Sequence, residues 1–452
     1  MLFYPRAEVV LGFVLDYPFE ARSANFTLQN FAGFGAAALD ALDALRRRFP
    51  EIAERFDANI AHLVRVAPQE LHITRNPYTA ADECKIKIDY RHFPFDPRIA
   101  RAVAVECHLG TAPSIDAPFI ANSRTRRFIG YADTGDWSWD DDDTITFVCR
   151  DHTALLIDTP WLDRGQLDLK NDLQTIIRAI LDQDDATRPI ALDFRALPPP
   201  ILAQSRSDVA GDKQTASTRQ SVWDTIVELV SEAGLIAWIE QRTLIVDGGQ
   251  TLRGLPSTPF VAGRNLKSLR VRRHIGRKRT PPVTVEAWNV EKKEVLSATW
   301  PALPDDAPTG EGATQKPIRK LRFTLSNIID QAVLIKAARN IWLRFALLDL
   351  AVEFETNDVR GPNDEFLLDL KPGSPVAIHF SEDERIHLNG RPFEQRRAWL
   401  AGRGYSGQVA TAIAYAYEQL TPAYQVVEIG QHFRASQGIT LSFRCASYIT
   451  AD

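Results

Sequence analysis

The sequence contains little cysteine and no long apolar segment, and each shortage excludes a class of protein. Only four cysteines occur among its 452 residues. They are widely spaced and each lies within an apolar pattern, which is typical of buried free thiols and not of a disulfide framework. They are Cys84, Cys107, Cys149 and Cys445. No run of about 18 apolar residues occurs, so the sequence encodes no membrane-spanning helix.

An excess of charge of one sign is also lacking. The formal net charge is −5, and 25% of the residues are charged against 45% that are hydrophobic. This balance is that of an ordinary globular protein and lacks the overall basic character of a nucleic-acid-binding protein. The N-terminal stretch contains Arg6 and Glu8 and no small-residue cleavage site, so it does not form a signal peptide. We therefore expect a protein that is made and assembled in a cytoplasm.

The stretch 128–160 carries the clearest structural pattern. Residues 128–133 are apolar enough for a strand, and a turn rich in glycine and aspartate follows. The next residues, 144–149, alternate with a period of two, which places every second side chain on a buried face. The buried set is Ile145, Phe147 and Cys149. Two such runs around an Asp/Gly-rich turn predict a β-hairpin.

A pair of opposite charges ends the second strand of this hairpin. Arg150 and Asp151 are followed by the apolar segment 154–157, which Asp158 closes. No nucleophile with its base is present, so the pattern predicts a structural corner and not a catalytic loop. We expect the side chains of Arg150 and Asp151 to hold the turn into 153–157 by charge-assisted hydrogen bonds.

The length of the chain predicts two to four domains. The patterns indicate an α+β, β-dominated fold with two β-barrel domains, a small α/β domain and helical insertions. The expected domains are residues 1–160, 161–262 and 263–452, the last with a helical hairpin insertion at about 386–421. Both barrel regions place alternating strands around one predicted helix, at 36–56 and at 328–345. This repeated order of elements indicates a duplication, although no residue-level repeat survives.

Several of these segments, in this order, resemble one protein family. The matching residues are Ala81 to Tyr90, Phe93 to Pro97, Phe128 to Tyr131, Asp133, Asp140 to Asp143, Cys149 to Asp151, Thr153, Leu155, Leu156, Asp158 and Asn265 to Trp288. Together they cover most of the chain and resemble the baseplate hub proteins of contractile phage tails and related injection machines, the late-control-D-like family. The specificity of the resemblance lies in the order of the pieces, since no single piece is a chemical fingerprint.

The resemblance implies a structural protein of the virion tail, assembled in the bacterial host cytoplasm. Such hubs are homotrimers in which each chain supplies two tail-tube-like β-barrels, so that three chains present a pseudo-sixfold ring to the hexameric tail tube. Implied partners are the tail tube protein, a central spike protein, and baseplate wedge or sheath-initiator proteins. The chain ends soon after its last predicted strand, so a separate spike is expected. The implied structural motif is Gly130, Asp133, Cys149, Arg150, Asp151, Leu155 and Asp158.

Two groups of residues resemble metal sites by composition. Asp140 to Asp143 cluster carboxylates, which calcium prefers, but they lack the alternating ligands and terminal glutamate of a calcium loop. Cys149 with His152, and Cys107 with His108, each resemble half of a zinc site. Cys149 falls on a buried strand face and no compact second pair is present. We therefore predict no metal site, a solvated turn at 140–143, and cysteines in the core.

Two further segments resemble ligand-binding motifs. Residues 402–407 read GRGYSG and fit the dinucleotide pattern GxGxxG, but no apolar strand precedes them. A turn between two helices, with Ser406 as N-cap, explains them better. Residues 270–279 read RVRRHIGRKR and could contact phosphate. No aromatic residues interleave this basic stretch, so we predict a solvated strand face that, if functional, meets an acidic protein.

No catalytic constellation or cofactor motif is visible in the sequence. Motifs of serine hydrolases, zinc proteases and P-loop enzymes are all missing. We therefore predict no enzyme, no cofactor, and no pair of titratable groups at reacting distance in the deepest pocket. The alternative function is a tail-associated cell-wall hydrolase that uses carboxylates of the acidic loops. A nucleic-acid-binding protein that uses residues 270–279 is a third possibility.

Overall fold

The computed structural model describes most of the chain. The described residues are 4–15, 61–76, 80–93, 100–133, 138–139, 144–161, 171–196, 221–233, 235–247, 256–273, 281–289, 292–302, 321–325, 331–346, 350–388, 391–419 and 423–447. The predicted helix at 36–56 and the aspartates at 140–143 lie outside these ranges.

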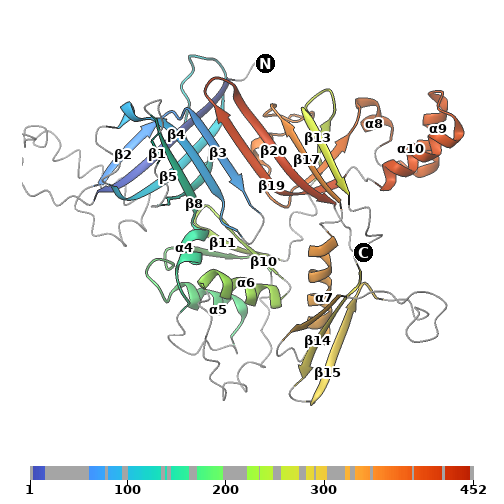
Figure 1. Cartoon of the computed structure of the whole chain (residues 1–452), viewed down its shortest axis with the longest axis horizontal. Coiled ribbons are helices and arrows are strands. Elements are labelled where there is room, and N and C mark those ends of the chain that lie inside the picture. The colour runs from blue at the N-terminus through green and yellow to red at the C-terminus, as the bar shows by residue number, and fades with distance from the viewer. Residues whose placement is uncertain are drawn as a thin grey trace, which may run out of the picture.

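A largely antiparallel sheet of fourteen described strands forms the body of the molecule (Figure 1). Eleven of them follow one hydrogen-bonded path, β13-β17-β20-β19-β3-β4-β8-β6-β5-β1-β2, to which β7, β12 and β18 are attached. The strands are β1 (Tyr4–Leu15), β2 (Ala61–Val66), β3 (Glu70–Arg75), β4 (Glu83–Asp89), β5 (Ala100–Ala112), β6 (Arg126–Ala132), β7 (Ser138–Trp139), β8 (Thr144–Asp151), β12 (Thr258–Val261), β13 (Ser268–Arg273), β17 (Leu350–Thr356), β18 (Pro375–His379), β19 (Ala423–Arg434) and β20 (Gly438–Ser447). The β-dominated α+β class predicted from the sequence is confirmed.

Side-chain alternation explains why these segments form strands. In β4 the buried Cys84, Ile86 and Ile88 alternate with Lys85 and Lys87. The register of β4 with β8 places these three buried residues opposite Cys149, Phe147 and Ile145, the buried residues of the predicted hairpin. That hairpin is present, because β6 pairs with β8 in antiparallel register. One face of each strand therefore enters a common apolar core.

The strands divide into two halves with the same spatial order. We call β1 to β8 the first half, and β12, β13 and β17 to β20 the second half. The first half contains the path β3-β4-β8-β6-β5-β1, and the second half the path β13-β17-β20-β19-β18-β12. When the strands of each path are ranked by their order along the chain, the two rankings are the same. They differ in their last pair, since β1 is antiparallel to β5 whereas β12 is parallel to β18.

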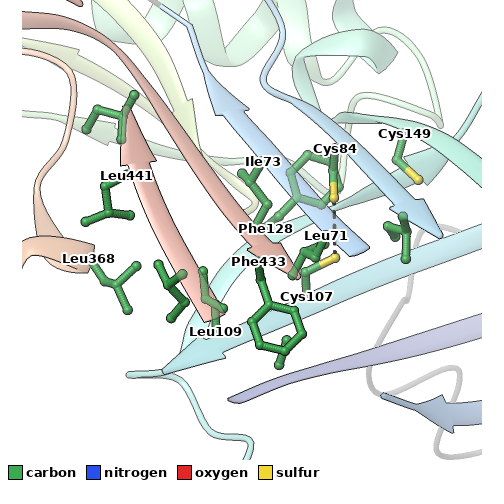
Figure 2. Close-up of a cluster of buried hydrophobic side chains, with 14 of the residues drawn as sticks. Leu71, Ile73, Cys84, Cys107, Leu109, Phe128, Cys149, Leu368, Phe433 and Leu441 are labelled. Atoms are coloured by element: carbon green, nitrogen blue, oxygen red, sulfur yellow. Dashed lines mark hydrogen bonds between the residues drawn. The ribbon is translucent and has the colours of Figure 1, made fainter. Parts of the chain in front are cut away.

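The two halves are joined by the ladder between β3 and β19, which we call the seam. The first residues of β19 pair with β18, and after an irregularity between Val426 and Glu428 residues 429–434 pair with β3. The core is continuous across this ladder, because Leu71 and Ile73 of β3 lie in one cluster with Phe433 and Leu441 of the second half (Figure 2). The halves therefore share hydrogen bonds and apolar contacts.

A small α/β module follows the first half in sequence. It contains α4 (Thr153–Asp158), α5 (Leu173–Leu181), α6 (Val222–Glu232), β9 (Ala191–Phe194), β10 (Ile236–Glu240) and β11 (Thr243–Asp247). Asp172 caps α5 by accepting a hydrogen bond from the Thr175 amide at 2.9 Å. Ser221 and Asp224 form a reciprocal capping box at the start of α6. Both helices bury their apolar faces against the sheet β10-β11-β9.

A second small sheet differs from the sequence expectation. It contains β14 (Val283–Asn289), β15 (Glu294–Trp300) and β16 (Leu321–Leu325), in the order β15-β14-β16, with α7 (Gln331–Ala346) packed on one face. The predicted helix at 328–345 was expected within the second barrel, but Leu334 and Ala338 instead contact Val283 and Val285 of this separate sheet. Likewise β12, within the predicted α/β range 161–262, pairs with β18.

A helical hairpin extends from the second half, at the right of Figure 1. Its helices are α8 (Glu382–His387), α9 (Phe393–Gly402) and α10 (Gly407–Gln419). Elsewhere in the described chain, short 3-10 helices lie at η1 (Tyr90–His92) and η4 (Leu367–Asp369). Leu400 of α9 packs against Ala410 and Ala414 of α10. The described part of the chain contains no helix with the length and apolarity needed to cross a membrane.

Candidate functional site

The predicted motif residues meet where β6, β8 and α4 converge. The Arg150 guanidinium ion-pairs through Nε with Asp133 at 2.7 Å and through Nη2 with Asp158 at 3.0 Å. Asp133 directly follows β6, and Asp158 ends α4. Arg150 therefore connects the ends of three elements that the sequence pattern placed in one hairpin and corner.

Asp151 organises the start of α4. Its carboxylate accepts hydrogen bonds from the Thr153 amide at 3.0 Å and the Thr153 hydroxyl at 3.1 Å. Its own amide donates to the Asp82 carbonyl oxygen at 3.0 Å. Asp151 is buried, as are Cys149 before it and Leu155 after it. The side chain thus satisfies a helix-terminal amide that would otherwise have no partner within the helix.

Gly130 allows the closest approach of β6 to this corner. It is the register partner of Asp151. A Cβ atom at Gly130 would lie 2.1 Å from the Arg150 carbonyl oxygen and 2.8 Å from the Asp151 Cα atom. Both are backbone atoms that cannot rotate away. The seven predicted motif residues are therefore gathered within one corner; their importance for stability and assembly remains a prediction.

We expect the substitution Arg150→Ala to lower the free energy of unfolding by about 1 kcal/mol, because it removes two partly exposed ion pairs at once. Arg397→Ala is the matched control, since its ion pair with Glu394 is solvated and lies within a single helix. Urea unfolding of both variants measures the difference. An Arg150 variant that unfolds at the same urea concentration as the parent contradicts the role assigned to this side chain.

A cavity of about 80 Å³ lies beside the corner, where the two halves meet the module. Asp82 and Asp151 come from the first half, Trp238 and Glu240 from the module, and Lys371 from the second half. Its other charged or aromatic lining residues are Arg75, Arg195 and Trp223. Residues from three parts of the chain therefore line one cavity.

The cavity brings together carboxyl groups that the sequence pattern did not connect. Burial, followed by the nearby charge of Asp82, raises the pKa of Asp151 well above its ordinary value. Burial raises the pKa of Asp82 to about 6, which Arg75 and the Asn76 amide oppose. The expectation that the deepest pocket lacks a pair of titratable groups at reacting distance stays a prediction. The pairing of β4 with β8 creates the contact, and it joins residues far apart in sequence.

The tip of the β10–β11 hairpin binds both halves. Glu240 forms an ion pair with Lys371 of the second half, and Gln241 accepts a hydrogen bond from Arg126 of the first half. Arg126 also lies 3.5 Å from Glu106, which is buried and contacts His108 at 3.0 Å. The module is therefore attached by charged and polar contacts.

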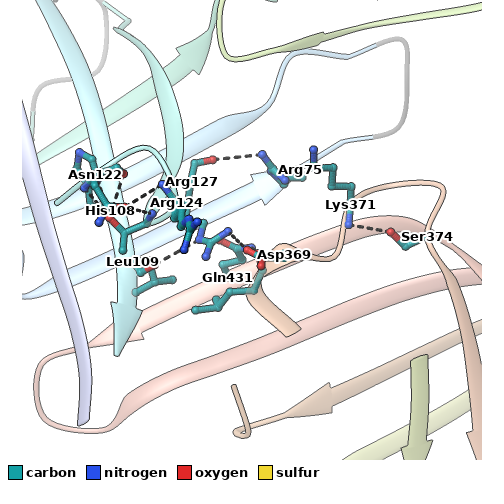
Figure 3. A network of polar contacts seen from close by, with 12 residues as sticks. Arg75, His108, Leu109, Asn122, Arg124, Arg127, Asp369, Lys371, Ser374 and Gln431 are labelled. Atoms are coloured by element: carbon teal, nitrogen blue, oxygen red, sulfur yellow. Dashed lines mark hydrogen bonds and ion pairs between the residues drawn. The ribbon is translucent and has the colours of Figure 1, made fainter. Parts of the chain in front are cut away.

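A second polar network crosses between the halves (Figure 3). Arg127 of β6 forms a 2.6 Å ion pair with Asp369 of η4 and donates a hydrogen bond to the Leu109 carbonyl oxygen. Gln431 of β19 donates to the Leu368 carbonyl oxygen at 3.2 Å. Arg127 therefore holds the η4 segment of the second half against the strands of the first half, while Gln431 binds η4 to β19 within the second half.

Comparison with solved structures identifies this architecture, although the sequence itself matches no protein-family model and no curated protein. The tail protein from Neisseria meningitidis MC58 aligns with a TM-score of 0.53 and 13% identity, over 86% of this chain and 93% of that protein. The prophage MuSo2 43 kDa tail protein from Shewanella oneidensis aligns with a TM-score of 0.52 and 13% identity, over 85% and 96%.

This chain has a phage tail protein fold. The likeness extends over nearly the full length of both tail proteins and over 85–86% of this chain. The resemblance noted in the sequence is confirmed, because the similar solved structures are phage tail proteins. At 13% identity the comparison establishes the fold, and the function is argued separately below.

The residues considered for other chemistry have structural positions in this tail protein fold. The Cys84 and Cys107 sulfur atoms lie 3.6 Å apart in the apolar core (Figure 2). Burial raises the pKa of Cys84 and Cys149 well above the ordinary thiol value. Within the ranges that the structure describes, no group of three or more His, Cys, Asp or Glu residues could hold a metal ion.

The other two sequence motifs, residues 402–407 and the basic stretch 270–279, form a turn and part of a strand. Residues 402–407 connect α9 to α10, and Ser406 Oγ accepts a 3.5 Å hydrogen bond from the Val409 amide. Of the basic stretch, residues 270–273 lie in β13, where Arg272 ion-pairs with Glu353 of β17 at 3.3 Å. Residues 274–279 fall outside the described ranges.

Proposed function

We propose that this chain is the structural hub of a phage-type tail baseplate, a homotrimer that joins the hexameric tail tube to the central spike. The observation that carries the proposal is the equal strand order of the two halves, β3-β4-β8-β6-β5-β1 and β13-β17-β20-β19-β18-β12. A threefold assembly can match a sixfold tube only if each chain presents two equivalent surfaces. Two halves of one topology meet this requirement.

The seam provides a model for the contact between chains. Within one chain, β3 of the first half pairs with β19 of the second half. The strand equivalent to β3 in the second half is β13, which ends the hydrogen-bonded path formed by the described strands. An open strand edge is a template for pairing with another chain. We propose that β13 forms the corresponding seam with a neighbouring chain, which would close a ring of six halves.

The remaining partners follow from this arrangement. One face of the ring would bind the tail tube protein and the other a separate central spike, while baseplate wedge or sheath-initiator proteins would bind at the periphery. The protein would then be located in the virion tail and assembled in the bacterial host cytoplasm. It would need neither cofactor nor membrane, and no sequence-specific contact with nucleic acid.

The cavity gives the hydrolase alternative its only support among the described residues, since it combines carboxyl groups with Trp223 and Trp238. Its volume of about 80 Å³ is far below the roughly 300–1,000 Å³ of ligand pockets. Asp151 is already bonded to Thr153. We therefore favour a structural junction, and expect no cleared zone on a peptidoglycan zymogram and no salt-dependent retention on DNA.

Light scattering of the purified chain tests the hub proposal. We expect a trimer, and we expect Val271→Asp to shift it toward monomer, because Val271 on β13 is 42% exposed and would be covered by the neighbouring chain. Val295→Asp is the matched control, since this residue is 61% exposed on the separate sheet. A parent that stays monomeric, alone and with tail tube protein, contradicts the proposal. Equal loss of trimer in both variants contradicts the role of β13.

A further inference from the structure

Two histidines face each other across the seam. His72 of β3 and His432 of β19 are register partners in the antiparallel ladder. Their ring centroids lie 5.2 Å apart, and the ring planes are inclined by 33°. His72 is exposed and His432 is partly exposed, on the sheet face opposite the buried Leu71 and Phe433. Two imidazoles are thus paired at the surface where the halves join.

The spacing suits a single metal ion. Directly opposed residues in antiparallel strands hold their Cβ atoms about 4.5–5.5 Å apart. Zinc–nitrogen bonds of about 2.0–2.1 Å require two nitrogens roughly 3–3.5 Å apart, which neighbouring rings that lean together can provide. A Cβ at Gly430 would lie 3.5 Å from His72 Nε2 and would meet the Ser442 hydroxyl, so this hydroxyl lies on the same side of the strand as the nitrogen.

The surrounding charges are balanced. Glu83 and Lys85 of β4 lie near His72, while Glu70 and Arg434 lie near His432 and form an ion pair with each other at 3.4 Å. Two carboxylates and two cations therefore surround the rings, and a dication meets no net repulsion.

We propose that His72 and His432 chelate one Zn²⁺ ion across the seam, with water completing its coordination. Imidazole is a preferred ligand of this class of divalent ion. The bound ion would cross-link β3 to β19 and thereby fasten the two halves to each other. The sequence predicted no metal site because the two histidines are far apart along the chain and belong to no spaced motif. The site requires only one folded chain and is independent of the trimer.

Calorimetric titration with Zn²⁺ tests the site. We expect one ion per chain, and loss of saturable binding in both His72→Ala and His432→Ala. His387→Ala is the matched control, since this partly exposed histidine stacks on Trp399 and has no histidine opposite it; it should bind as the parent does. Circular dichroism establishes that each variant is folded. Binding that persists in both seam variants, or that is lost in the control as well, overturns the assignment.

Hydrogen exchange of the parent provides a second measurement that needs no variant. A chelated ion at the seam should slow exchange of the amides in 70–75 and 429–434 when Zn²⁺ is added, and leave those of the module unchanged. Zinc binding without slower exchange in these two strands contradicts the proposed cross-link, and the same is true of slowing spread evenly over the chain.

Discussion

Gly130→Ala should destabilise the protein on the order of 3 kcal/mol, the largest effect that we expect of any single methyl group. The added Cβ would lie 2.1 Å from the Arg150 carbonyl oxygen. Relief requires β6 to move away from β8, which breaks the pairing of Gly130 with Asp151 and disturbs the start of α4. Overpacking that forces the backbone to shift typically costs about 1–3 kcal/mol and occasionally more, and this contact is with backbone atoms.

Two other glycines provide graded controls for this measurement. A Cβ at Gly430 would meet the Ser442 hydroxyl, which can rotate, so Gly430→Ala should cost less. Gly402 ends α9 with nothing within 4 Å of the added atom, so Gly402→Ala should be neutral or slightly stabilising. Urea unfolding midpoints of the three variants give the ranking. A Gly130 variant as stable as the Gly402 variant contradicts the close approach of β6 and β8.

Asp82→Asn should increase stability at pH 8 by about 2–3 kcal/mol and have no effect at pH 4. Burial raises the pKa of Asp82 to about 6 from 3.8. The native state therefore holds the proton more tightly than the unfolded state does. The resulting stabilisation is complete below about pH 4 and is lost as the pH rises through about 6. Asparagine keeps the neutral form at every pH, and its side-chain oxygen can still accept a hydrogen bond from the Asn76 amide.

Urea unfolding of parent and variant at several pH values between 4 and 8 measures this difference. The pKa of His379 is lowered to about 4 by burial, so this histidine also makes stability depend on pH. Its contribution is the same in both proteins and cancels in the difference. Asp185→Asn, at an 81% exposed side chain, should show a difference near zero throughout. An Asp82 variant that is less stable than the parent at pH 8 shows that the Arg75 contact outweighs burial.

Elements whose signal is local could be predicted from the sequence. The alternation of Ile86 and Ile88 with lysines, and of Ile145, Phe147 and Cys149 with their neighbours, identified β4 and β8 with their buried faces. Helix α5 followed from the spacing of its apolar residues, and its start is fixed by Asp172. Such patterns are visible because a strand or helix is specified by residues close together in the chain.

The predicted corner could be derived from the sequence only in part. Arg150 and Asp151 were expected to hold the turn that follows them, and both contact it, through Asp158 and Thr153. Asp133 was part of the resemblance, but its ion pair with Arg150 depends on the register of β6 with β8. Gly130 was part of the motif, but the sequence offered no reason why a glycine is needed there. The reason is the nearby Arg150 carbonyl oxygen, which only the tertiary structure shows.

The composition and local periodicity of this sequence determined its strands, its helices and its β-dominated class, since burial of one face depends on neighbouring residues. The tertiary structure alone decided which distant strands meet. The pairing of β3 with β19 joins the halves, opposes His72 to His432, and continues the core from Ile73 to Phe433. The pairing of β4 with β8 likewise places Asp82 beside Asp151. The physical reason is that any strand edge can pair with many others, and the choice depends on burial and hydrogen bonding summed over the whole fold.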